Sequence, residues 1–415
     1  MESLIINGGK KLNGEVTVSA AKNACLPILF GCLLNQEKVK LKSLPELRDI
    51  KTSIRLLEEL GAKVTGELSE LTIDCKHVDK TRAPYDLVKT MRASVLVLGP
   101  LLSRFGEAQV SLPGGCAIGG RPVDIHLSNL EKMGAKIKLE NGYIQATASK
   151  LKGATLDLSF PSVGATENLL MAAVFADGET VINNAAKEPE ITDLANFLIS
   201  MGAVIEGHGT STIKISGVSK LNSCDYKPIG DRIEAATFLL TGLLSDQKIT
   251  VKGFCSEHLS SVFSILKEMN AKIEIRENEA TVHPSQLKGV KVTTMPYPGF
   301  PTDVQAQLMT LMCKADGVSV ITENIFENRF MHVPELNRLG ADIKVEGKSS
   351  IITGNVDFVS APVMCTDLRA SAALVMAALV AKGETKISRI YHLDRGYEKI
   401  EEKLSKLGAN IKRVS

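Results

Sequence analysis

The sequence predicts an α/β protein of two domains in which one βαβαββ unit occurs six times. The first observation is a phrase that recurs roughly every 70 residues, far longer than a solenoid period: a hydrophobic residue, Gly-Ala or Asn-Ala, then a β-branched run. The copies lie at 60–64, 133–137, 201–205, 269–273, 339–343 and 407–411. The second observation is that each copy ends a helix-like segment and precedes strand-like ones, so all copies mark one point of the unit.

The elements of one unit can be assigned in order. A small or charged residue opens an apolar helix, as at 21–29, and a short strand follows, as at 38–41. A second, amphipathic helix ends at Gly61, because glycine suits the left-handed conformation that terminates helices. Two strands around a turn close the unit, as at 136–144, where Asn141-Gly142 is typical of a hairpin. The predicted order is β-α-β-α-β-β.

The first helix of each unit opens at an equivalent position. The openings are Lys22, Arg92, the Ser162-Val163-Gly164 step, Arg232, Asp303 and Arg369. Charged residues at helix starts can be simple caps, but Lys and Arg oppose the helix dipole at that end. Basic residues at four of the six openings therefore favour a functional role over capping.

Six units are predicted to divide three and three, with helices inside and sheets outside each half. The break is predicted at the Pro/Gly-bearing stretch 227–230. The predicted domains are residues 22–229, and residues 1–21 together with 230–415. A cleft between the two halves is the expected ligand site.

Composition excludes several classes of function. The 49 basic and 47 acidic residues give a formal net charge of +2, and aromatic residues make up only 4%, which disfavours nucleic-acid binding. The N-terminus has no signal-peptide pattern, and apolar stretches such as 372–381 are too short to span a membrane. Eight cysteines without a C-x-x-C pair indicate neither a zinc site nor a disulfide framework, so we expect a cytoplasmic protein without a bound metal.

The most distinctive loop runs from Leu112 to Asp124 and frames Cys116 with paired glycines. Such a backbone can move and can approach a ligand closely. It matches neither a Walker phosphate-binding loop nor a dinucleotide fingerprint. Two interpretations stay open on the residues alone: a surface hairpin with an incidental thiol, or a reactive thiol tuned by the neighbouring Arg121.

Two further segments interrupt the repeat with polar residues. The segment 300–307 places Asp303 at a helix start, where the carboxylate could be a cap or a base. The segment 323–330 mixes acids, an amide, an arginine and two phenylalanines, which fits neither a pure core nor a pure surface.

Taken together, these motifs resemble the UDP-N-acetylglucosamine 1-carboxyvinyltransferase family over the whole chain. The resemblance rests on 20–23, the cysteine loop 113–124, 300–303, 326–330, 367–369 and 394–397. It implies a two-domain inverse α/β barrel of the EPSP synthase superfamily. It also implies an enzyme that transfers the enolpyruvyl group of phosphoenolpyruvate to the 3-hydroxyl of UDP-N-acetylglucosamine and releases phosphate, the first committed step of peptidoglycan precursor synthesis.

The resemblance assigns the residues that would handle phosphoenolpyruvate. Several cations must converge on a substrate that carries a carboxylate and a phosphate. By resemblance these are Lys22, Arg121 and Arg395, with Asn23 and Arg92 nearby. Cys116 matches the family's proton donor to C3, and is the thiol that phosphoenolpyruvate or fosfomycin modifies. Asp303 matches the carboxylate that hydrogen-bonds the attacking hydroxyl, and we assign it the role of base.

The resemblance also assigns the contacts of the sugar nucleotide and implies no cofactor. The contacts are Arg92, Arg121, Pro122, Val123, Asp124, Ile125, Ser162, Val163, Gly164, Asp303 and Ile325. Backbone N–H groups at the helix start 162–164 suit the diphosphate. The chain has Phe160-Pro161 where one branch of the family has Lys-Val, so a side-chain cation contact from that position is absent.

Three alternatives compete with this interpretation. The shikimate-pathway enolpyruvyl transferase shares the six-unit fold but lacks the cysteine loop. A catalytically weak paralogue that only binds the sugar nucleotide is disfavoured by intact Lys22, Cys116, Asp303 and Arg395. An RNA-end-processing enzyme built from similar units is disfavoured by the near-neutral charge and few aromatics.

Overall fold

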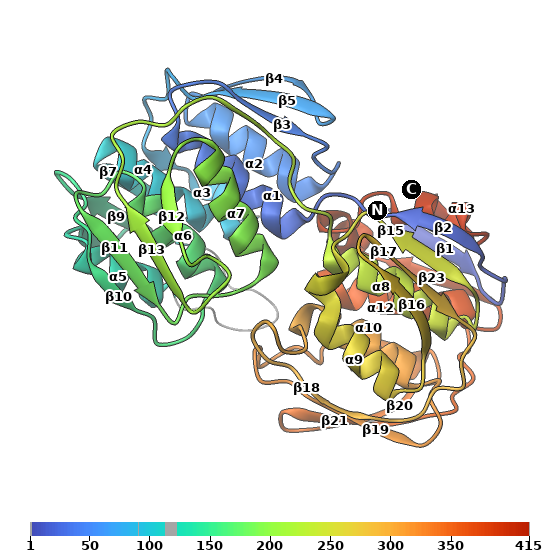
Figure 1. Ribbon diagram of the computed structural model, residues 1–415. Coiled ribbons are helices and arrows are strands. Elements are labelled where there is room, and N and C mark those ends of the chain that lie inside the picture. Colours follow the sequence, from blue (N-terminus) through green and yellow to red (C-terminus); the bar gives the residue numbers. More distant parts are fainter. Residues whose placement is uncertain (1, 90, 113–122, 415) are drawn as a thin grey trace. The chain divides into compact units, whose positions relative to one another are not determined.

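A computed structural model of the chain describes residues 2–89, 91–112 and 123–414 (Figure 1). These residues form two compact units. Of the described residues, the middle unit comprises 20–89, 91–112 and 123–229, and the terminal unit comprises 2–19 and 230–414. Each unit has its own hydrophobic core.

The middle unit contains three four-stranded sheets with one common topology. Their strand orders are β14 (Cys224–Tyr226)-β3 (Val39–Lys42)-β5 (Glu70–Asp74)-β4 (Lys63–Glu67), β6 (Arg82–Ala83)-β7 (Glu107–Ser111)-β9 (Tyr143–Thr147)-β8 (Lys136–Glu140), and β10 (Thr155–Asp157)-β11 (Glu179–Asn183)-β13 (Thr212–Ser216)-β12 (Val204–Glu206). In each sheet the first pair is parallel and the other two pairs are antiparallel.

The terminal unit repeats this topology in three more sheets. Their orders are β2 (Gly14–Thr17)-β15 (Ile249–Lys252)-β17 (Glu279–His283)-β16 (Lys272–Arg276), β18 (Lys291–Thr293)-β19 (Val318–Thr322)-β21 (Ser349–Thr353)-β20 (Asp342–Glu346), and β22 (Val363–Met364)-β23 (Glu384–Ser388)-β1 (Ser3–Asn7)-β24 (Asn410–Val414). The blue strands β1 and β2 lie among strands from the C-terminal half (Figure 1). The predicted six βαβαββ units are therefore confirmed.

Strands from distant segments complete three of these units. β14 pairs in parallel with β3, although it follows β3 by almost the whole middle unit. β2 pairs in parallel with β15, and β1 pairs antiparallel with β24 from the opposite end of the chain. Each of the two compact units therefore contains a sheet completed by a strand that is remote in sequence. The repeat pattern did not predict these strand pairings.

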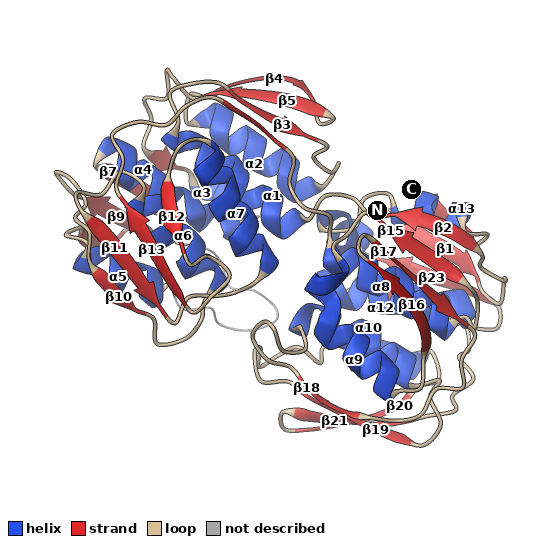
Figure 2. Ribbon diagram, viewed as in Figure 1, coloured by secondary structure: helices blue, strands red, loops and turns tan. Residues whose placement is uncertain are grey.

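The first helix of each repeat is buried on all sides. These helices are α1 (Lys22–Gly31), η2 (Arg92–Val97) with α4 (Leu98–Phe105), α6 (Val163–Ala173), α8 (Arg232–Leu244), α10 (Gln305–Met312) and α12 (Leu368–Val380). Their residues are apolar around nearly the whole circumference, which is typical of helices enclosed in a core. Figure 2 shows the strands at the periphery of each unit and these helices inside it. Helices inside and sheets outside is the predicted inverse arrangement.

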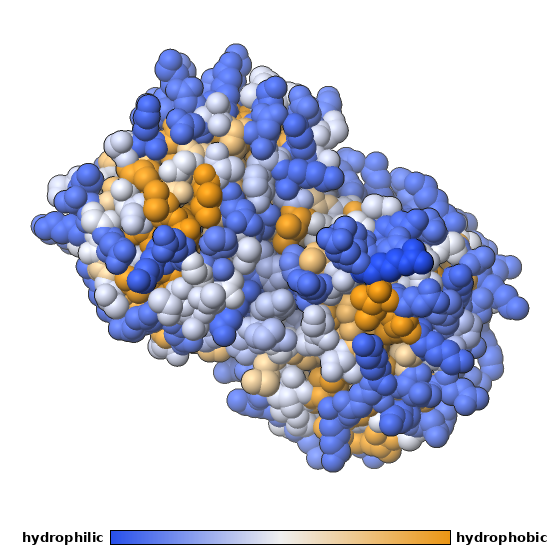
Figure 3. Space-filling view, in the orientation of Figure 1, coloured by the Kyte–Doolittle hydropathy of each residue, from blue (hydrophilic) through white to orange (hydrophobic). Residues whose placement is uncertain are grey.

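The remaining helices are short or amphipathic. They are α2 (Arg48–Glu59), α3 (Tyr85–Val88), α5 (Asp124–Lys132), α7 (Pro189–Ser200), α9 (Ser260–Glu268), α11 (Val333–Arg338), α13 (Ile400–Lys406) and the 3₁₀ turns η1 (Cys32–Leu34), η3 (Ser256–Leu259), η4 (Thr302–Val304) and η5 (Ile390–Arg395). In α2 one face, including Ile50 and Leu56, is buried, while the other carries charges. Figure 3 shows the same pattern at the surface, where apolar residues form limited groups among hydrophilic ones.

The recurring phrase has a single conformational cause. After the second helix of every repeat, the residue before Ala has a positive φ: 107° at Gly61, 93° at Gly134, 105° at Gly202, 65° at Asn270, 93° at Gly340 and 101° at Gly408. Glycine reaches this region at no steric cost, and asparagine is among the few side chains that tolerate it. The hairpin prediction at Asn141-Gly142 is also confirmed, because both residues have positive φ between β8 and β9.

Candidate functional site

The helix openings singled out in the sequence lie at the starts of the inner helices. Lys22, Arg92 and Arg232 are the first residues of α1, η2 and α8. In α8 and α12 the cap is a separate aspartate: Asp231 accepts from two N–H groups of α8, and Asp367 does so in α12. Arg232 and Arg369 are therefore not the capping residues of their helices, as the sequence argument expected.

Asp303 lies between two arginines in the terminal unit. Nη2 of Arg329 donates to its Oδ1 at 2.8 Å, and Nη2 of Arg369 donates to its Oδ2 at 2.8 Å. Both arginine side chains are buried, at 3% and 4% exposure, whereas the Asp303 side chain is 24% exposed. Charge-assisted bonds to two guanidinium groups stabilise the ionised carboxylate and fix its orientation. The remaining exposed part of Asp303 can accept a hydrogen bond from a ligand hydroxyl.

Glu323 joins the loop before Asp303 to the loop that carries Ile325. Its Oε2 accepts from the hydroxyl of Thr302 at 2.8 Å. Its Oε1 accepts from the hydroxyl of Thr294 at 2.7 Å and from the N–H of Ile325 at 2.7 Å. The Glu323 residue is only 3% exposed, so these bonds replace the water that a carboxylate would otherwise need. The polar segments 300–307 and 323–330, which the sequence analysis described separately, are therefore held together by hydrogen bonds to Glu323.

Arg369 also packs against buried Tyr397. Its guanidinium lies 5.7 Å from the Tyr397 ring centroid, and the Tyr397 hydroxyl is 3.0 Å from Nε2 of Gln307. Gln307 Nε2 in turn donates to the backbone carbonyl of Asp303 at 3.0 Å. Burial acts to lower the pKa of Arg369, but the charges of Asp303, Tyr397 and Asp231, together with the hydrogen bond to Asp303, outweigh it and raise that pKa above its ordinary value. Arg369 is therefore a permanent cation.

Arg395, predicted as a phosphoenolpyruvate ligand, is the last residue of η5 and is half-buried. The preceding Asp394 accepts from both Nη atoms of Arg413, at 3.0 and 2.6 Å. This bidentate pair holds the η5 backbone against β24.

In the middle unit, the predicted cation Lys22 lies near a buried carboxylate. Its Nζ is 3.8 Å from Oδ2 of Asp49 on α2, and the two side chains are 12% and 4% exposed. Asn23 follows on α1 and is half-buried. A buried acid beside Lys22 limits the positions that the ammonium group occupies.

Arg92, His126 and the start of α6 form a second group in the middle unit. Burial and the charge of Arg92 lower the pKa of His126 to about 4. A Cβ placed on Gly164 would lie 3.4 Å from Cε1 and 3.6 Å from Nε2 of this ring, so the ring edge faces the helix start. Ser162 caps α6 by accepting from the N–H of Ala165 at 3.3 Å. Val163 and Gly164 follow in the first turn, whose N–H groups have no helical carbonyl to bond.

Three predicted residues, Cys116, Arg121 and Pro122, lie outside the described residues. Of the rest of that loop, Val123 precedes α5, Asp124 is its exposed first residue, and Ile125 is half-buried. Sequence reasoning missed Asp49, Glu323 and the pairing of Arg329 with Asp303. Each is a polar residue whose partner is distant in sequence, so no local pattern identified it.

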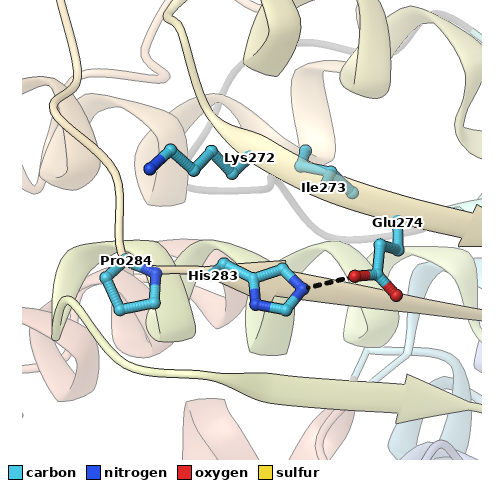
Figure 4. Close-up of a pocket in the computed structure, with 5 residues that line it drawn as sticks. All are labelled: Lys272, Ile273, Glu274, His283 and Pro284. Atoms are coloured by element: carbon cyan, nitrogen blue, oxygen red, sulfur yellow. Dashed lines mark hydrogen bonds and ion pairs between the residues drawn. The ribbon is translucent and has the colours of Figure 1, made fainter.

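The pocket drawn in Figure 4 lies elsewhere, on the β16–β17 hairpin. It is lined by Lys272, Ile273, Glu274, His283 and Pro284. Nε2 of His283 is 3.0 Å from Oε1 of Glu274, and no predicted site residue contributes to the lining. This pocket is a shallow surface feature without the convergent cations that the predicted chemistry needs.

Within the described residues, no group of three or more His, Cys, Asp or Glu side chains is placed to hold a metal ion. In the same residues, no helix is long and apolar enough to cross a membrane.

Comparison with known proteins places this architecture. Residues 6–404 match the family model described as EPSP synthase (3-phosphoshikimate 1-carboxyvinyltransferase). The chain is 54% identical over 415 residues to the UDP-N-acetylglucosamine 1-carboxyvinyltransferase of Geotalea daltonii, with both chains fully covered. It is 54% identical over 417 residues to the enzyme of the same name from Nitratidesulfovibrio vulgaris, covering 100% of this chain and 99% of the relative. The chain belongs to the UDP-N-acetylglucosamine 1-carboxyvinyltransferase family.

Solved structures of the wider enolpyruvyl transferase group share the fold. The enolpyruvyl transferase NikO from Streptomyces tendae superposes with a TM-score of 0.91 at 28% identity, covering 100% of this chain and 99% of that one. EPSP synthase from Acinetobacter baumannii superposes with a TM-score of 0.79 at 19% identity over the full length of both chains, a likeness of fold alone. The predicted family membership and fold class are both confirmed.

Proposed function

We propose that the chain transfers the carboxyvinyl group of phosphoenolpyruvate to the 3-hydroxyl of UDP-N-acetylglucosamine, the first committed step of peptidoglycan precursor synthesis. The observation that carries this proposal is full-length identity of 54% to relatives named for this activity. The arginine-held carboxylate of Asp303 supports it, because a fixed acceptor is what an attacking hydroxyl requires. The shikimate-pathway alternative has the family model that matches residues 6–404 and a likeness of fold at 19% identity.

The reaction is an addition followed by an elimination. The sugar oxygen bonds to C2 of phosphoenolpyruvate, C3 gains a proton, and Asp303 accepts the proton of the hydroxyl. The C2–O bond to phosphate then breaks, C3 loses a proton, and the carbon double bond re-forms in the product. We assign the protonation of C3 to Cys116, the nucleophilic thiol that would also form covalent adducts.

Fixed cations hold the trianionic donor and compensate the charge of the departing phosphate. We assign this role to Lys22, Arg121 and Arg395, with Asn23 and Arg92 as further donors. Asp49 helps to hold the Lys22 side chain in place, since its carboxylate lies 3.8 Å from the ammonium nitrogen. Side-chain cations can do this work without a metal ion.

We assign the contacts of the sugar nucleotide to the residues that the family resemblance names. In the middle unit they are Arg92, Arg121, Pro122, Val123, Asp124, Ile125, Ser162, Val163 and Gly164, and in the terminal unit Asp303 and Ile325. The first turn of α6 suits the diphosphate, because its N–H groups point along the helix axis toward an anion.

We propose the cytoplasm as the site of action. Both proposed substrates are multiply charged and do not cross a lipid bilayer unaided. No disulfide joins the seven cysteines among the described residues, which is consistent with a reducing compartment.

The decisive experiment measures phosphate release from phosphoenolpyruvate with UDP-N-acetylglucosamine or with shikimate 3-phosphate as acceptor. We expect release with the sugar nucleotide alone, and loss of most of the rate in Cys116→Ser. Cys255→Ser is the matched control, because Cys255 lies in the loop before η3 and has no assigned role. Release with shikimate 3-phosphate only would refute the proposal.

A further inference from the structure

Asn168 makes three hydrogen bonds that fix the orientation of its own amide. Its Oδ1 accepts from the backbone N–H of Gly99 at 2.6 Å. Its Nδ2 donates to the backbone carbonyl of Val95 at 3.1 Å. A backbone N–H can only donate and a carbonyl can only accept, so the oxygen and nitrogen of the amide cannot be exchanged. The residue is fully buried on α6, and its amide has no other stable arrangement.

This fixed amide determines which nitrogen of His126 carries the proton. Nδ2 of Asn168 also lies 3.1 Å from Nδ1 of His126, and an amide nitrogen is a donor only. Nδ1 must therefore accept, which leaves the proton of the neutral ring on Nε2. The low pKa of His126, about 4 through burial and the charge of Arg92, keeps the ring neutral at physiological pH.

The protonated edge of the ring faces the start of α6. Nε2 and Cε1 lie 3.6 and 3.4 Å from the position that a Cβ on Gly164 would take. None of the described residues accepts a hydrogen bond from Nε2, although the residue is only 6% exposed. An N–H that faces the helix start and has no acceptor among the described residues is available to an acceptor on a ligand. The adjacent cation Arg92 and the first-turn N–H groups make that acceptor an anion.

We propose that Asn168 is a positioning residue that fixes His126 as its Nε2–H tautomer, and that this N–H donates to a diphosphate oxygen of the bound nucleotide. The inference rests on the proposed function, which supplies a nucleoside diphosphate as the ligand. It adds His126 to the residues that bind the nucleotide and gives Asn168 a role beyond joining α4 to α6. A second-layer residue thus sets the hydrogen-bonding character of a ligand-binding one.

The tautomer can be tested in the wild-type protein by NMR of ¹⁵N-labelled histidine at pH 7.5. We expect a protonated Nε2 and an unprotonated Nδ1 for His126, and a shift of the Nε2–H signal on addition of UDP. In Asn168→Asp, the carboxylate still accepts from Gly99 but cannot donate, so Nδ1 of His126 should become protonated. An Nδ1 proton in the wild type, or an unprotonated Nδ1 in the variant, would overturn the positioning role.

The ligand contact can be tested by calorimetric titration with UDP. The amide nitrogen of glutamine can occupy the place of Nε2, while that of asparagine can occupy the place of Nδ1. We expect His126→Asn to raise the Kd of UDP at least about tenfold and His126→Gln to remain within about threefold of wild type. His77→Asn and His77→Gln serve as controls for the substitutions, because His77 is exposed in the same unit. Urea unfolding of every variant reports whether it is folded.

The two proposals fail separately. Equal UDP affinity of the two His126 variants, with wild-type turnover of UDP-N-acetylglucosamine intact, would overturn the diphosphate contact and leave the proposed function standing. Absence of phosphate release in the wild type, with UDP binding still dependent on His126, would overturn the proposed function and leave the contact standing.

Discussion

Arg329 donates to Oδ1 of Asp303 from a guanidinium that is 3% exposed, across 26 positions of sequence. Arg369 makes the matching bond to Oδ2, so the carboxylate has a cation on each oxygen. Two guanidinium groups, one on each oxygen, favour the ionised form of the carboxylate and fix its orientation. Asp303 is therefore suited to orient a hydroxyl before it takes its proton.

We predict that Arg329→Met slows phosphate release by roughly tenfold to a hundredfold, because small displacements of a catalytic group have effects of that size. It should also lower the free energy of unfolding by about 1–3 kcal/mol, less than for a wholly unpaired ion because Arg369 remains. Arg329→Lys should recover part of the rate, since an ammonium keeps the charge but not the planar geometry. Steady-state kinetics and urea unfolding measure both effects.

The control is Arg276→Met, which removes an arginine that is 74% exposed and paired with Glu279. Exposed pairs contribute about 0–1 kcal/mol, so this variant should match wild type in rate and nearly match it in stability. If Arg329→Met behaves like this control, the arginines do not position Asp303.

We predict that Glu323→Ala lowers the free energy of unfolding far more than Glu323→Gln does. The alanine variant leaves the donors of Thr302, Thr294 and Ile325 without their acceptor, at a cost of about 2–4 kcal/mol. Glutamine keeps one oxygen for the Oε1 partners, and its amide can donate to the hydroxyl of Thr302, which is able to accept. Urea unfolding and the KM for UDP-N-acetylglucosamine should therefore change much less with glutamine. Similar unfolding curves for Glu323→Ala and the exposed-site variant Glu346→Ala would contradict this role.

We predict that the folded protein loses stability as the pH falls from 6.5 to about 4, because two of its histidines are buried. Burial lowers the pKa of both His126 and His332 to about 4, while an unfolded histidine titrates near 6.5. Below pH 6.5 the unfolded chain therefore binds protons that the folded chain does not, and stability falls until the pH reaches about 4. Each histidine accounts for about 3 kcal/mol across this window.

Urea unfolding of wild type and His126→Gln between pH 7 and pH 4 measures the His126 part. Glutamine does not titrate, so the difference in unfolding free energy between wild type and variant should shift against the wild type by about 3 kcal/mol as the pH falls. A difference that is independent of pH would show that His126 titrates normally in the folded protein.

Local patterns in the sequence accounted for the repeated architecture. The six left-handed positions, the hairpin at Asn141-Gly142 and the apolar inner helices are all set by residues close together in the chain. The pairings of β1, β2 and β14 with strands remote in sequence were not predictable in this way. β14 has three residues and pairs with β3 far back in the sequence, so its position depends on tertiary contacts.

The residues of the candidate site also fall into those that local patterns identified and those that they did not. Lys22 and Asp303 were identifiable because they occupy equivalent points of a repeat, where a departure from the pattern is visible. Asp49 and Asn168 lie within ordinary helical segments, and Glu323 lies in a polar segment that was noticed without a role for this residue. Their roles follow from a partner brought close by folding, and periodicity carries no information about such partners.

Glycines in this chain are required for two different physical reasons. At Gly134 the φ is +93° and a Cβ would meet nothing within 4 Å, so the requirement is conformational. At Gly217 a Cβ would lie 1.7 Å from the carbonyl oxygen of Ala176, so the requirement is space. The equivalent of Gly134 in the fourth repeat is Asn270, which adopts a φ of 65°.

We predict that these two reasons separate in a small set of variants. Gly134→Ala should cost about 1–2 kcal/mol, the strain of a left-handed alanine, and Gly134→Asn should cost less because asparagine tolerates that region. Gly217→Ala should cost more than either, since backbone must move to admit the methyl group, and Gly217→Asn should be worse still. Urea unfolding of the four variants gives the order directly. If asparagine is worse than alanine at position 134, side-chain clashes rather than backbone conformation would explain the glycine of the repeated phrase.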